Sequence, residues 1–535
     1  MSWLLLALFA LVYLAVGPWT FVLAAALLAV PRIRERVPRP RPTWRGAGIG
    51  VAALAVLALL VVLIPDGRLP IPSAGGSLVT PAYDGRQVSA RPVVAEAPPQ
   101  HPWLAANGTS SVHKDAWNTD AVQAPGPLGD RPGVETGSYG LEQCASLTFD
   151  SRGRMVGLCR DRKGPLLRVL DPEKLRPLAS KRLPAGEDDG PEGHDVCGGS
   201  YFYLDNGDRA VVTTADRKIQ AIGTADADDE PDLTVDESWS LQDLVPADDC
   251  LVAALPDWTG RIWWSSQEGR VGVVDPVAGT VQVLELGEAV SNSFAVDETG
   301  GVFLVTDRAL YRLAVDAAGA PVVTWRTEYD RGVERKAGQP SQGSGTTPTL
   351  VDGNLVAIAD NAEPRMRVVF LDRGTGTEVC HSAVFDGGES ATDTSLVSVG
   401  SGVVVENNHD YDSPLSTALG FGTSPGLARV DERDGQCRVV WTNDSVAPSA
   451  VPVVSWANGL LYTWTKRPNL WGVAAWYLTA IDVHSGHTAF SVRSGTGALH
   501  DNHHGGLVLG TDGSAYVGTL GGLVRVRDFE RKKKD

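Results

Sequence analysis

The sequence predicts an all-β fold, a β-propeller of eight four-stranded blades that follows two transmembrane helices. A unit of four short strands recurs from about residue 141, with the period of about 40 to 60 residues that is typical of propeller blades. The chain also contains 59 glycines and 34 prolines in 535 residues, which suits short strands joined by many turns. Two uncharged stretches near the N-terminus predict the helices.

The first transmembrane helix is predicted over residues 1–30, because positions 3–30 carry no charge and about 20 residues suffice to cross a bilayer. Gly17-Pro18 predicts a kink near its middle. A hairpin of two helices is less favoured, since each half would be too short. The second helix is predicted over 46–65. The loop between them, residues 31–45, has six arginines and one glutamate, and short basic loops stay in the cytoplasm.

This pattern predicts a multi-pass protein of the cell membrane, with the N-terminus and everything after residue 65 outside the cytoplasm. The part beyond residue 65 has 41 basic and 63 acidic residues, a net charge of about −22. A surface that acidic repels nucleic acid. The expected partners are therefore the membrane and an unknown small-molecule or protein ligand, and no nucleic acid. The basic tail, 529–535, is expected to be solvated.

Residues 66–140 are rich in proline, glycine and alanine, and are expected to form an extracytoplasmic linker and lead-in segment. Within it, residues 101–129 mix His113, Asp115 and Trp117 without strand alternation. Two interpretations fit this stretch. It is an irregular strap packed on the propeller wall, or it is a cap over a polar face that contributes His113 or Asp115 to a site.

The predicted propeller occupies residues 141–528, and its clearest mark is an aspartate at the end of the third strand of a unit. Neighbouring aspartates are 41 to 59 residues apart, except for one gap of 104 residues that holds a degenerate copy. Such a carboxylate can accept backbone N–H bonds in the turn that follows, so these residues are predicted to be structural. They are Asp171, Asp275, Asp316, Asp372, Asp431 and Asp482.

The number of units gives the number of blades. Units begin near residues 141, 195, 250, 294, 345, 393, 450 and 503, which predicts eight blades, or seven if one unit is an insertion. The last unit has only three strands. A strand from the other end of the chain can complete it and remove the open edge, and the predicted donor lies within 85–140.

Turns such as "VDERDGQCRVVW" and "VDAAGAPVVTW" resemble those of the quinoprotein-like β-propeller superfamily, which includes pyrroloquinoline quinone dehydrogenases and the outer-membrane assembly propeller. The resemblance covers about 141–528 and implies the blade rather than an activity, since this fold hosts many functions. Quinone-binding members carry two adjacent half-cystines beneath the cofactor. The sequence has no Cys-Cys pair, so a quinone cofactor is not expected.

Unusual polar stretches fall in loops that are expected to open on one face of the ring. These loops enter the first strand of a blade or join its second and third strands, whereas the opposite face has plain turns. Loops that converge at a channel mouth commonly form a binding site. The candidate ligand-binding residues are His113, Asp115, His194, Asp195, Asp249, Asp393, His409, Asp410, His500, Asp501, His503 and His504.

The stretch "HDNHH" at 500–504 holds three of the ten histidines. Imidazoles beside carboxylates suit a first-row divalent metal, and the candidate ligands are His194, His409 and His503. Their spacing around a wide ring favours a polar ligand site without a metal. The sequence contains no nucleophile motif, phosphate loop or HExxH. It therefore favours a binding module; the alternative is an enzyme that uses these side chains, metal-assisted or by acid–base chemistry.

Six cysteines outside the cytoplasm, without a CxxC motif, predict disulfides. A hairpin around "DSRG" that pairs residues 149 and 154 brings Cys144 opposite Cys159. Cys197 and Cys250 occupy equivalent positions at the inner strands of neighbouring units, and Cys380 and Cys437 lie on outer strands of adjacent units. The predicted pairs are Cys144–Cys159, Cys197–Cys250 and Cys380–Cys437, with Cys144–Cys197 as the competing pair.

Overall fold

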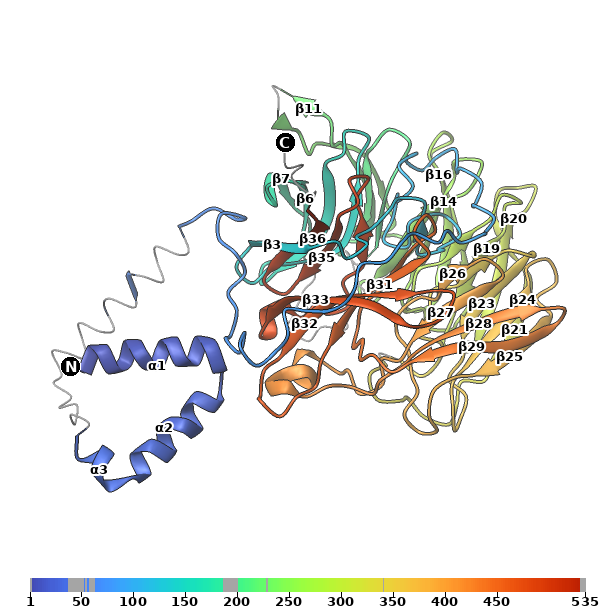
Figure 1. The fold of residues 1–535 in the computed structure, drawn as a ribbon. Coiled ribbons are helices and arrows are strands. Elements are labelled where there is room, and N and C mark those ends of the chain that lie inside the picture. The colour runs from blue at the N-terminus through green and yellow to red at the C-terminus, as the bar shows by residue number, and fades with distance from the viewer. Residues whose placement is uncertain are drawn as a thin grey trace, which may run out of the picture.

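The computed structural model describes residues 2–36, 52, 55–56, 63–185, 201–227, 230–339 and 341–529. Figure 1 shows a large body built of strands, with a pair of helices that projects from one side. Eight sheets, each with at least four strands, make up this body. The structure is therefore the predicted eight-bladed β-propeller, and the alternative of seven blades is wrong.

The first four blades follow one another along the chain. Blade 1 consists of β4 (Gln143–Phe149), β5 (Met155–Asp161), β6 (Gly164–Asp171) and β7 (Arg176–Arg182). Blade 2 consists of β8 (Phe202–Leu204), β9 (Ala210–Thr213), β10 (Lys218–Ile222) and β13 (Val235–Ser240), with the small hairpin β11 (Asp226–Ala227) and β12 (Glu230–Pro231) inserted. Blade 3 consists of β14 (Leu251–Pro256), β15 (Ile262–Ser266), β16 (Arg270–Asp275) and β17 (Thr280–Glu285). Blade 4 consists of β18 (Ala295–Val296), β19 (Val302–Val305), β20 (Ala309–Val315) and β21 (Pro321–Glu328).

The last four blades include strands from the N-terminal region. Blade 5 consists of β22 (Thr349–Val351), β23 (Leu355–Ala359), β24 (Arg367–Asp372) and β25 (Glu378–Ala383). Blade 6 consists of β26 (Val397–Val399), β27 (Gly402–Glu406), β28 (Leu427–Arg433) and β29 (Gln436–Asn443). Blade 7 consists of β30 (Val453–Ser455), β31 (Leu460–Lys466), β32 (Ala475–Asp482) and β33 (Thr488–Thr496), extended by β1 (Tyr83–Gly85) and β2 (Ala121–Val122). Blade 8 consists of β34 (Leu507–Leu509), β35 (Ala515–Thr519), β36 (Gly522–Asp528) and β3 (Pro132–Ser138).

Burial decreases from the inner to the outer strands of a blade. In blade 3 every residue of β14 and β15 is buried, whereas exposed and partly buried residues alternate along most of β17. A strand that is buried on both faces is expected to consist almost entirely of apolar residues, whereas in a half-exposed strand apolar and polar residues alternate. The core therefore lies between neighbouring blades, where large side chains such as Trp263 and Trp264 are fully buried.

The ring closes as the sequence predicts, with a strand from the lead-in segment. β3 pairs antiparallel with β36 along its whole length, from Pro132 opposite Asp528 to Ser138 opposite Gly522. The edge of the three-stranded C-terminal unit is thereby covered. This pairing joins two parts of the chain that are almost 400 residues apart.

Residues 104–122, here called the channel segment, run along the innermost strands of the ring. Their carbonyl oxygens accept hydrogen bonds of 2.8 to 3.0 Å from inner-strand N–H groups of blades 2, 4, 5, 6 and 7. At its end β2 pairs in parallel with β30. The first sequence interpretation, an irregular strap packed on the propeller, therefore fits, with the inner strands as the packing surface, whereas the surface cap is wrong. The inner strand of each blade has N–H groups at its free edge that face the axis of the ring. The carbonyl groups of an irregular segment can accept hydrogen bonds from them.

The N-terminal region forms α1 (Ser2–Val16), α2 (Trp19–Ala29) and the short α3 (Pro31–Arg34) instead of one kinked helix over 1–30. Gly17 has a φ of +72°, in the left-handed region, and Pro18 has no N–H to continue α1. The corner between α1 and α2 meets the propeller (Figure 1). In the part of the chain that the structure describes, no helix combines the length and the apolar character needed to cross a membrane. The second predicted helix, 46–65, lies largely outside that part.

Five of the six third-strand aspartates act as the sequence predicts. Asp171, Asp275, Asp316, Asp372 and Asp482 each accept backbone N–H bonds in the turn that follows. Asp431 differs, because β28 continues beyond it. The turn there is made by Asp434 and Gly435, both with positive φ, which is typical of a tight hairpin. Asp431 instead pairs with Arg429.

Two predicted disulfides are present, Cys144–Cys159 and Cys380–Cys437. Cys144 lies opposite Cys159 as predicted, but by a different register. Phe149 pairs with Met155 rather than with residue 154, and an irregularity between Cys144 and Ser146 restores the cysteine pairing. Cys250 is disulfide-bonded as well. Its predicted partner, Cys197, lies outside the described residues, so that pair stays a prediction.

Candidate functional site

Three loops, two from blade 6 and one that enters blade 8, bring five polar side chains together at one mouth of the channel. Asp393 precedes β26, Tyr411 lies between β27 and β28, and the other three precede β34. These are the two kinds of loop that the sequence predicts to share a face, and the contacts between them confirm it. The five residues, here called the mouth cluster, are Asp393, Tyr411, Asp501, His503 and His504.

A chain of hydrogen bonds links Asp501, Tyr411 and His503. The Tyr411 hydroxyl donates to Asp501 Oδ1 at 3.0 Å and lies 3.0 Å from His503 Nδ1. A hydroxyl has one proton and an ionised carboxylate only accepts, so the Nδ1–H of His503 donates to the Tyr411 oxygen. In this arrangement the neutral His503 ring has its acceptor lone pair on Nε2. The chain therefore selects one tautomer, as carboxylates behind functional histidines commonly do.

Asp501 is buried and accepts several hydrogen bonds. Thr417 Oγ1 donates to its Oδ2 at 2.8 Å, and the backbone N–H of His503 donates to its Oδ1 at 2.9 Å. Burial raises the pKa of Asp501 to about 6, although these donors and the charge of Lys466 act in the opposite direction. Burial, with the nearby carboxylate of Asp501, also raises the pKa of Tyr411 well above its usual range. The carboxyl group therefore titrates close to neutral pH.

The second half of the cluster is an ion-pair geometry between His504 and Asp393. His504 Nδ1 lies 3.2 Å from Asp393 Oδ2, and about a quarter of the His504 side chain is exposed. The rings of His503 and His504 are 4.9 Å apart, and Tyr411 packs edge-on against His504 at 5.4 Å. The two imidazoles thus form the solvent-facing layer, and the two carboxylates and the phenol lie beneath them.

The backbone of this loop adopts uncommon conformations. His503 and His504 have φ angles of +36° and +61°, in the left-handed region that residues other than glycine rarely adopt. The Gln143 side chain of blade 1 donates to the carbonyls of Asn502 and His503, which holds the turn in place. Consecutive non-glycine residues in such conformations are maintained where the surrounding structure fixes them, and they gather at functional sites.

Beneath the mouth, the channel segment contains a buried charged group. His113 Nδ1 lies 2.9 Å from Asp120 Oδ2, and Lys114 Nζ lies 3.8 Å from Asp120 Oδ1. All three side chains are buried, and burial lowers the pKa of Lys114 while the nearby carboxylates raise it. His113 Nε2 is also within reach of the hydroxyls of Thr347 and Ser395. These contacts join the segment to blades 5 and 6.

Asp115 and Tyr201 complete this layer. Burial raises the pKa of Asp115 to about 7, against hydrogen bonds from Thr119 and Trp117. Burial raises the pKa of Tyr201 to about 12, and the charges of both Asp393 and Asp120 contribute to the increase. The ring of Tyr201 lies 5.9 Å from that of His113.

Several predicted residues lie apart from the mouth cluster. His409 Nδ1 contacts Ser424 and Asp410, on the same loop as Tyr411. His500 is buried against Ser73, and burial lowers its pKa to about 4. Asp249 binds Ser266 and Arg270 within blade 3 and is structural. His194 and Asp195 lie outside the described residues.

A metal site with three closely spaced ligands is found at one place in the described part of the chain, at Glu142, Cys144 and Cys159. Both of these cysteines are in a disulfide, so they have no thiolate to offer. Within the same described part, His409 and His503 do not belong to such a group. The predicted ligand set therefore stays untested at His194 and is not preassembled at the other two residues.

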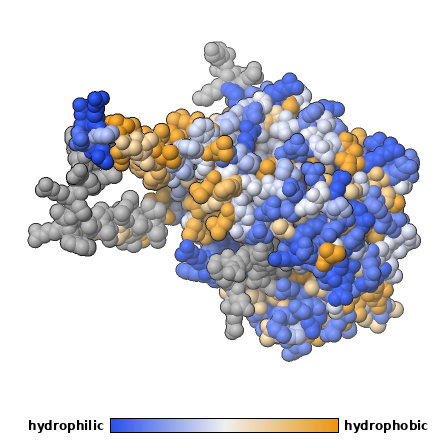
Figure 2. Space-filling view, turned by 90° about the horizontal axis from the view of Figure 1, so that it is seen from below, coloured by the Kyte–Doolittle hydropathy of each residue, from blue (hydrophilic) through white to orange (hydrophobic). Residues whose placement is uncertain are grey.

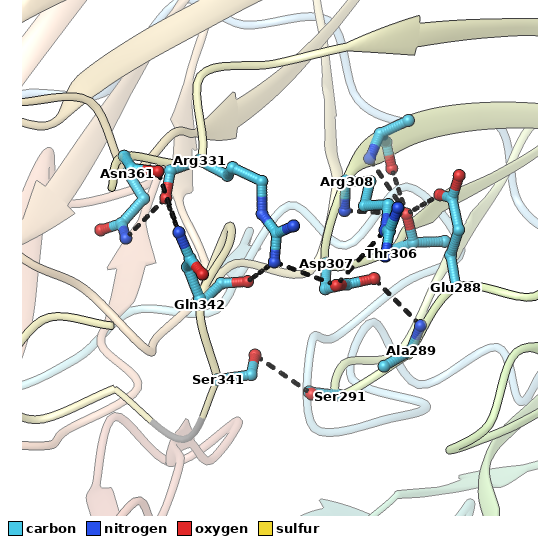
Figure 3. A network of polar contacts seen from close by, with 12 residues as sticks. Glu288, Ala289, Ser291, Thr306, Asp307, Arg308, Arg331, Ser341, Gln342 and Asn361 are labelled. Atoms are coloured by element: carbon cyan, nitrogen blue, oxygen red, sulfur yellow. Dashed lines mark hydrogen bonds and ion pairs between the residues drawn. The ribbon is translucent and has the colours of Figure 1, made fainter. Parts of the chain in front are cut away.

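A second polar network on the same face lies between blades 3, 4 and 5 (Figure 3). Arg331 pairs with Asp307 at 3.1 Å, and its carbonyl accepts from Asn361. Asp307 also accepts from the N–H of Ala289, and Thr306 donates to Glu288 at 2.6 Å. These bonds tie neighbouring loops to one another, so this network is interpreted as structural.

Sequence reasoning missed three contributors to the site, namely Gln143, Thr417 and Asp120. Gln143 and Asp120 reach it from other parts of the chain, and Thr417 lies in the short 3-10 helix η1 (Pro414–Gly420) within a long loop. No local pattern marks such residues. Tyr411 follows His409 and Asp410 in the same polar stretch, and its place in that predicted loop was the available signal.

No family model matches the chain. An uncharacterized protein from Archaeoglobus fulgidus is 28% identical over 379 residues, which cover 63% of this chain and 72% of that protein. Among solved structures, BamB from Moraxella catarrhalis has a TM-score of 0.36 and 13% identity, covering 60% of this chain and 93% of that one. Virginiamycin B lyase from Staphylococcus aureus has a TM-score of 0.40 and 9% identity, covering 74% and 99%.

Proposed function

We propose that this protein is a membrane-anchored, extracytoplasmic binding propeller whose mouth cluster binds a ligand. The observation that supports it is the convergence of two imidazoles, two carboxylates and a phenol from three loops of blades 6 and 8 at one mouth of the channel. Concave sites with a few oriented polar groups are the usual form of a binding site. The left-handed backbone at His503 and His504 adds support, because such conformations gather at functional sites.

The ligand that fits this chemistry carries a positively charged, hydrogen-bond-donating group such as an ammonium. The nearby Asp410 is an exposed carboxylate. The part of the chain beyond residue 65 has a net charge of about −22, which raises the local concentration of cations. Buried Asp393 and Asp501 supply further negative charge beneath the imidazoles.

The anchorage is proposed from the uncharged residues 3–30 and 46–64 and from the arginines between them. The two disulfides agree with an oxidising, extracytoplasmic location. The structure adds one observation in favour of the anchorage: α1 and α2 are apolar, and the corner between them meets the propeller.

The binding proposal is tested with the full-length protein and spermidine as the cationic probe. Thermal unfolding is measured at pH 7.5 with and without the probe, because a ligand that binds the folded state raises the midpoint. We expect spermidine to raise the midpoint for the wild type and not for His504→Ala. The matched control is His381→Ala, which removes an exposed histidine that also faces a carboxylate, Glu378, at 2.6 Å. It keeps the full shift.

Equal shifts in all three proteins would show that spermidine binds the acidic surface in general, and no shift in any would show that the mouth does not take a cation. Either result rejects the proposal.

The second candidate function is acid–base catalysis, and the Asp501–Tyr411–His503 chain supports it. A neutral imidazole with a fixed tautomer can act as a general base near neutral pH. Hydrolysis of p-nitrophenyl acetate should then fall in His503→Ala and Tyr411→Phe, relative to His381→Ala. Equal rates in all variants would exclude this role.

A further inference from the structure

Two neighbouring loops of the propeller expose large apolar side chains. The loop between β27 and β28, which contains η1, exposes Leu415, Leu419 and Phe421, and Leu415 is 81% exposed. The loop between β31 and β32 exposes Leu470, at 92%, and Trp471. Contiguous exposed apolar side chains of this size mark an interaction surface.

These loops lie against each other and against the corner of the apolar helices. The Asn469 N–H donates to the Gly420 carbonyl at 3.0 Å, which joins the two loops. Trp19 Nε1 donates to the Leu470 carbonyl at 2.9 Å, and the rings of Trp19 and Trp471 meet edge to face at 6.0 Å. The exposed residues of the two loops and Trp19 therefore form one continuous surface, here called the apolar patch.

The helices next to the patch are themselves apolar on every side. α1 and α2 contain no charged residue, and the large side chains that they expose in the described part include leucine, valine and phenylalanine. A helix that is apolar all round is stable only when it is buried, in protein or in lipid. Figure 2 shows apolar surface on the helices and on the adjoining edge of the propeller.

We propose that the apolar patch lies in the interfacial region of the bilayer that holds the helices, so that the propeller rests on the membrane. This inference rests on the proposed anchorage. Tryptophan at the level of lipid headgroups and leucine or phenylalanine inserted beside it are typical of such surfaces. The patch adjoins the helices that need lipid and includes Trp19 of α2, which favours a bilayer over a protein partner as its occupant.

The patch is connected to the mouth cluster. η1 carries Leu415 and Leu419 on the patch, and its Thr417 donates to Asp501 in the cluster. The loop that bears the patch also bears Tyr411. Insertion of the patch therefore turns the mouth towards the membrane surface, where the ammonium group of a lipid headgroup or of a membrane protein can reach it.

The test uses full-length protein incorporated into phosphatidylcholine nanodiscs. Leu470→Cys is labelled with nitrobenzoxadiazole, and its fluorescence is quenched by lipids with a doxyl group on the acyl chain. Val277→Cys is the matched control. Val277 is 96% exposed, but it lies in the turn between β16 and β17, on the opposite face. We expect quenching about twofold stronger at 470 than at 277, because only the former inserts.

Co-elution of protein and nanodisc is recorded in the same samples, so that the two proposals are separated. Co-elution with equal, weak quenching at both sites rejects the proposal that the apolar patch inserts into the bilayer, but it remains consistent with the proposed anchorage. Failure to co-elute overturns both, because the helices and the patch together should hold the protein on lipid. As a second measure, Leu470→Glu with Leu415→Glu should lower the quenching of a label at position 419, whereas Val277→Glu should not.

Discussion

At the scale of single residues, the three histidines of one short loop have three different environments. His500 is buried and held uncharged, His503 is oriented by Tyr411, and His504 faces Asp393 at the surface. The sequence predicts that the loop is polar and that it lies on the face with the other unusual polar loops, because its residue types and its position in the unit indicate both. It does not show which histidine turns inward, because that depends on packing against Ser73 from the distant lead-in segment.

The pH dependence of stability should separate His500 from its neighbour Asp501. The pKa of His500 is about 4 in the folded state and about 6.5 when unfolded, so the unfolded state binds more protons as pH falls below 6.5. Stability is then lost, by about 2 kcal/mol between pH 7 and pH 5. The pKa of Asp501 is raised to about 6 in the folded state, so below that pH the folded state binds more protons at this carboxylate than the unfolded state does. This group therefore adds stability as the pH falls from 7 to 5.

We therefore expect opposite changes when urea unfolding is compared at pH 7 and pH 5. His500→Gln should make the protein relatively more stable at pH 5, and Asp501→Asn should make it relatively less stable. Parallel changes in the two variants would mean that one of the two groups is not buried as described.

At the scale of elements, the channel segment shows where sequence reasoning reaches its limit. Blades are predictable because strand alternation, turn residues and the third-strand aspartate repeat with the unit. Residues 104–122 repeat nothing, and the contacts that fix them are carbonyl bonds to inner strands, which any sequence can make. Their polar composition suggested a surface position. The structure instead pairs those polar groups with one another inside the ring.

The charged group of the channel segment gives a prediction for this element. Asp120→Asn leaves Lys114 buried without its counter-charge, and removal of one partner of a buried pair costs about 3–5 kcal/mol. The double variant Lys114→Met with Asp120→Asn should cost less than the sum of the single changes, because the uncompensated charge is gone. The free energies of unfolding of the single and double variants are measured by guanidinium denaturation.

The surface pair Lys174 and Asp171, at 3.6 Å, is the control for that experiment. Lys174→Met should change stability by less than about 1 kcal/mol. Strict additivity of the two channel substitutions would show that Lys114 and Asp120 do not interact.

At the scale of the whole molecule, the number of blades and the closure by a strand from the N-terminal side follow from the sequence. Each blade needs four strands and the last unit has three, so one strand must come from elsewhere. The arrangement of the N-terminal helices does not follow in the same way. The length of the uncharged run, 28 residues, favours one kinked span over two short helices, and the structure forms two helices because Gly17 adopts a left-handed conformation.

The closure should depend on Arg525, which is buried where β3, β36 and blade 1 meet. It pairs with Glu135 of β3 and with Glu173 of blade 1. Arg525→Met leaves no buried charge behind, because both glutamates are partly exposed, so we expect a loss of about 1–3 kcal/mol. Faster proteolysis within 132–138 should accompany it.

Arg527 of the same strand contacts the same two glutamates but is more exposed. Arg527→Met should leave both stability and the proteolysis rate near those of the wild type. Similar behaviour of the two variants would show that the ring does not depend on the buried arginine.

The position of the channel segment has a consequence for the order in which the chain is made. The ribosome produces this segment before any blade, whereas the partner of the closing strand comes last; Leu128 and Asp528, which share a hydrogen bond, are 400 residues apart. At roughly 5–20 residues per second, roughly 20–80 s pass between their synthesis. We therefore expect the blades to fold one after another onto a segment that is already present, and this segment to serve as the template around which the ring is assembled.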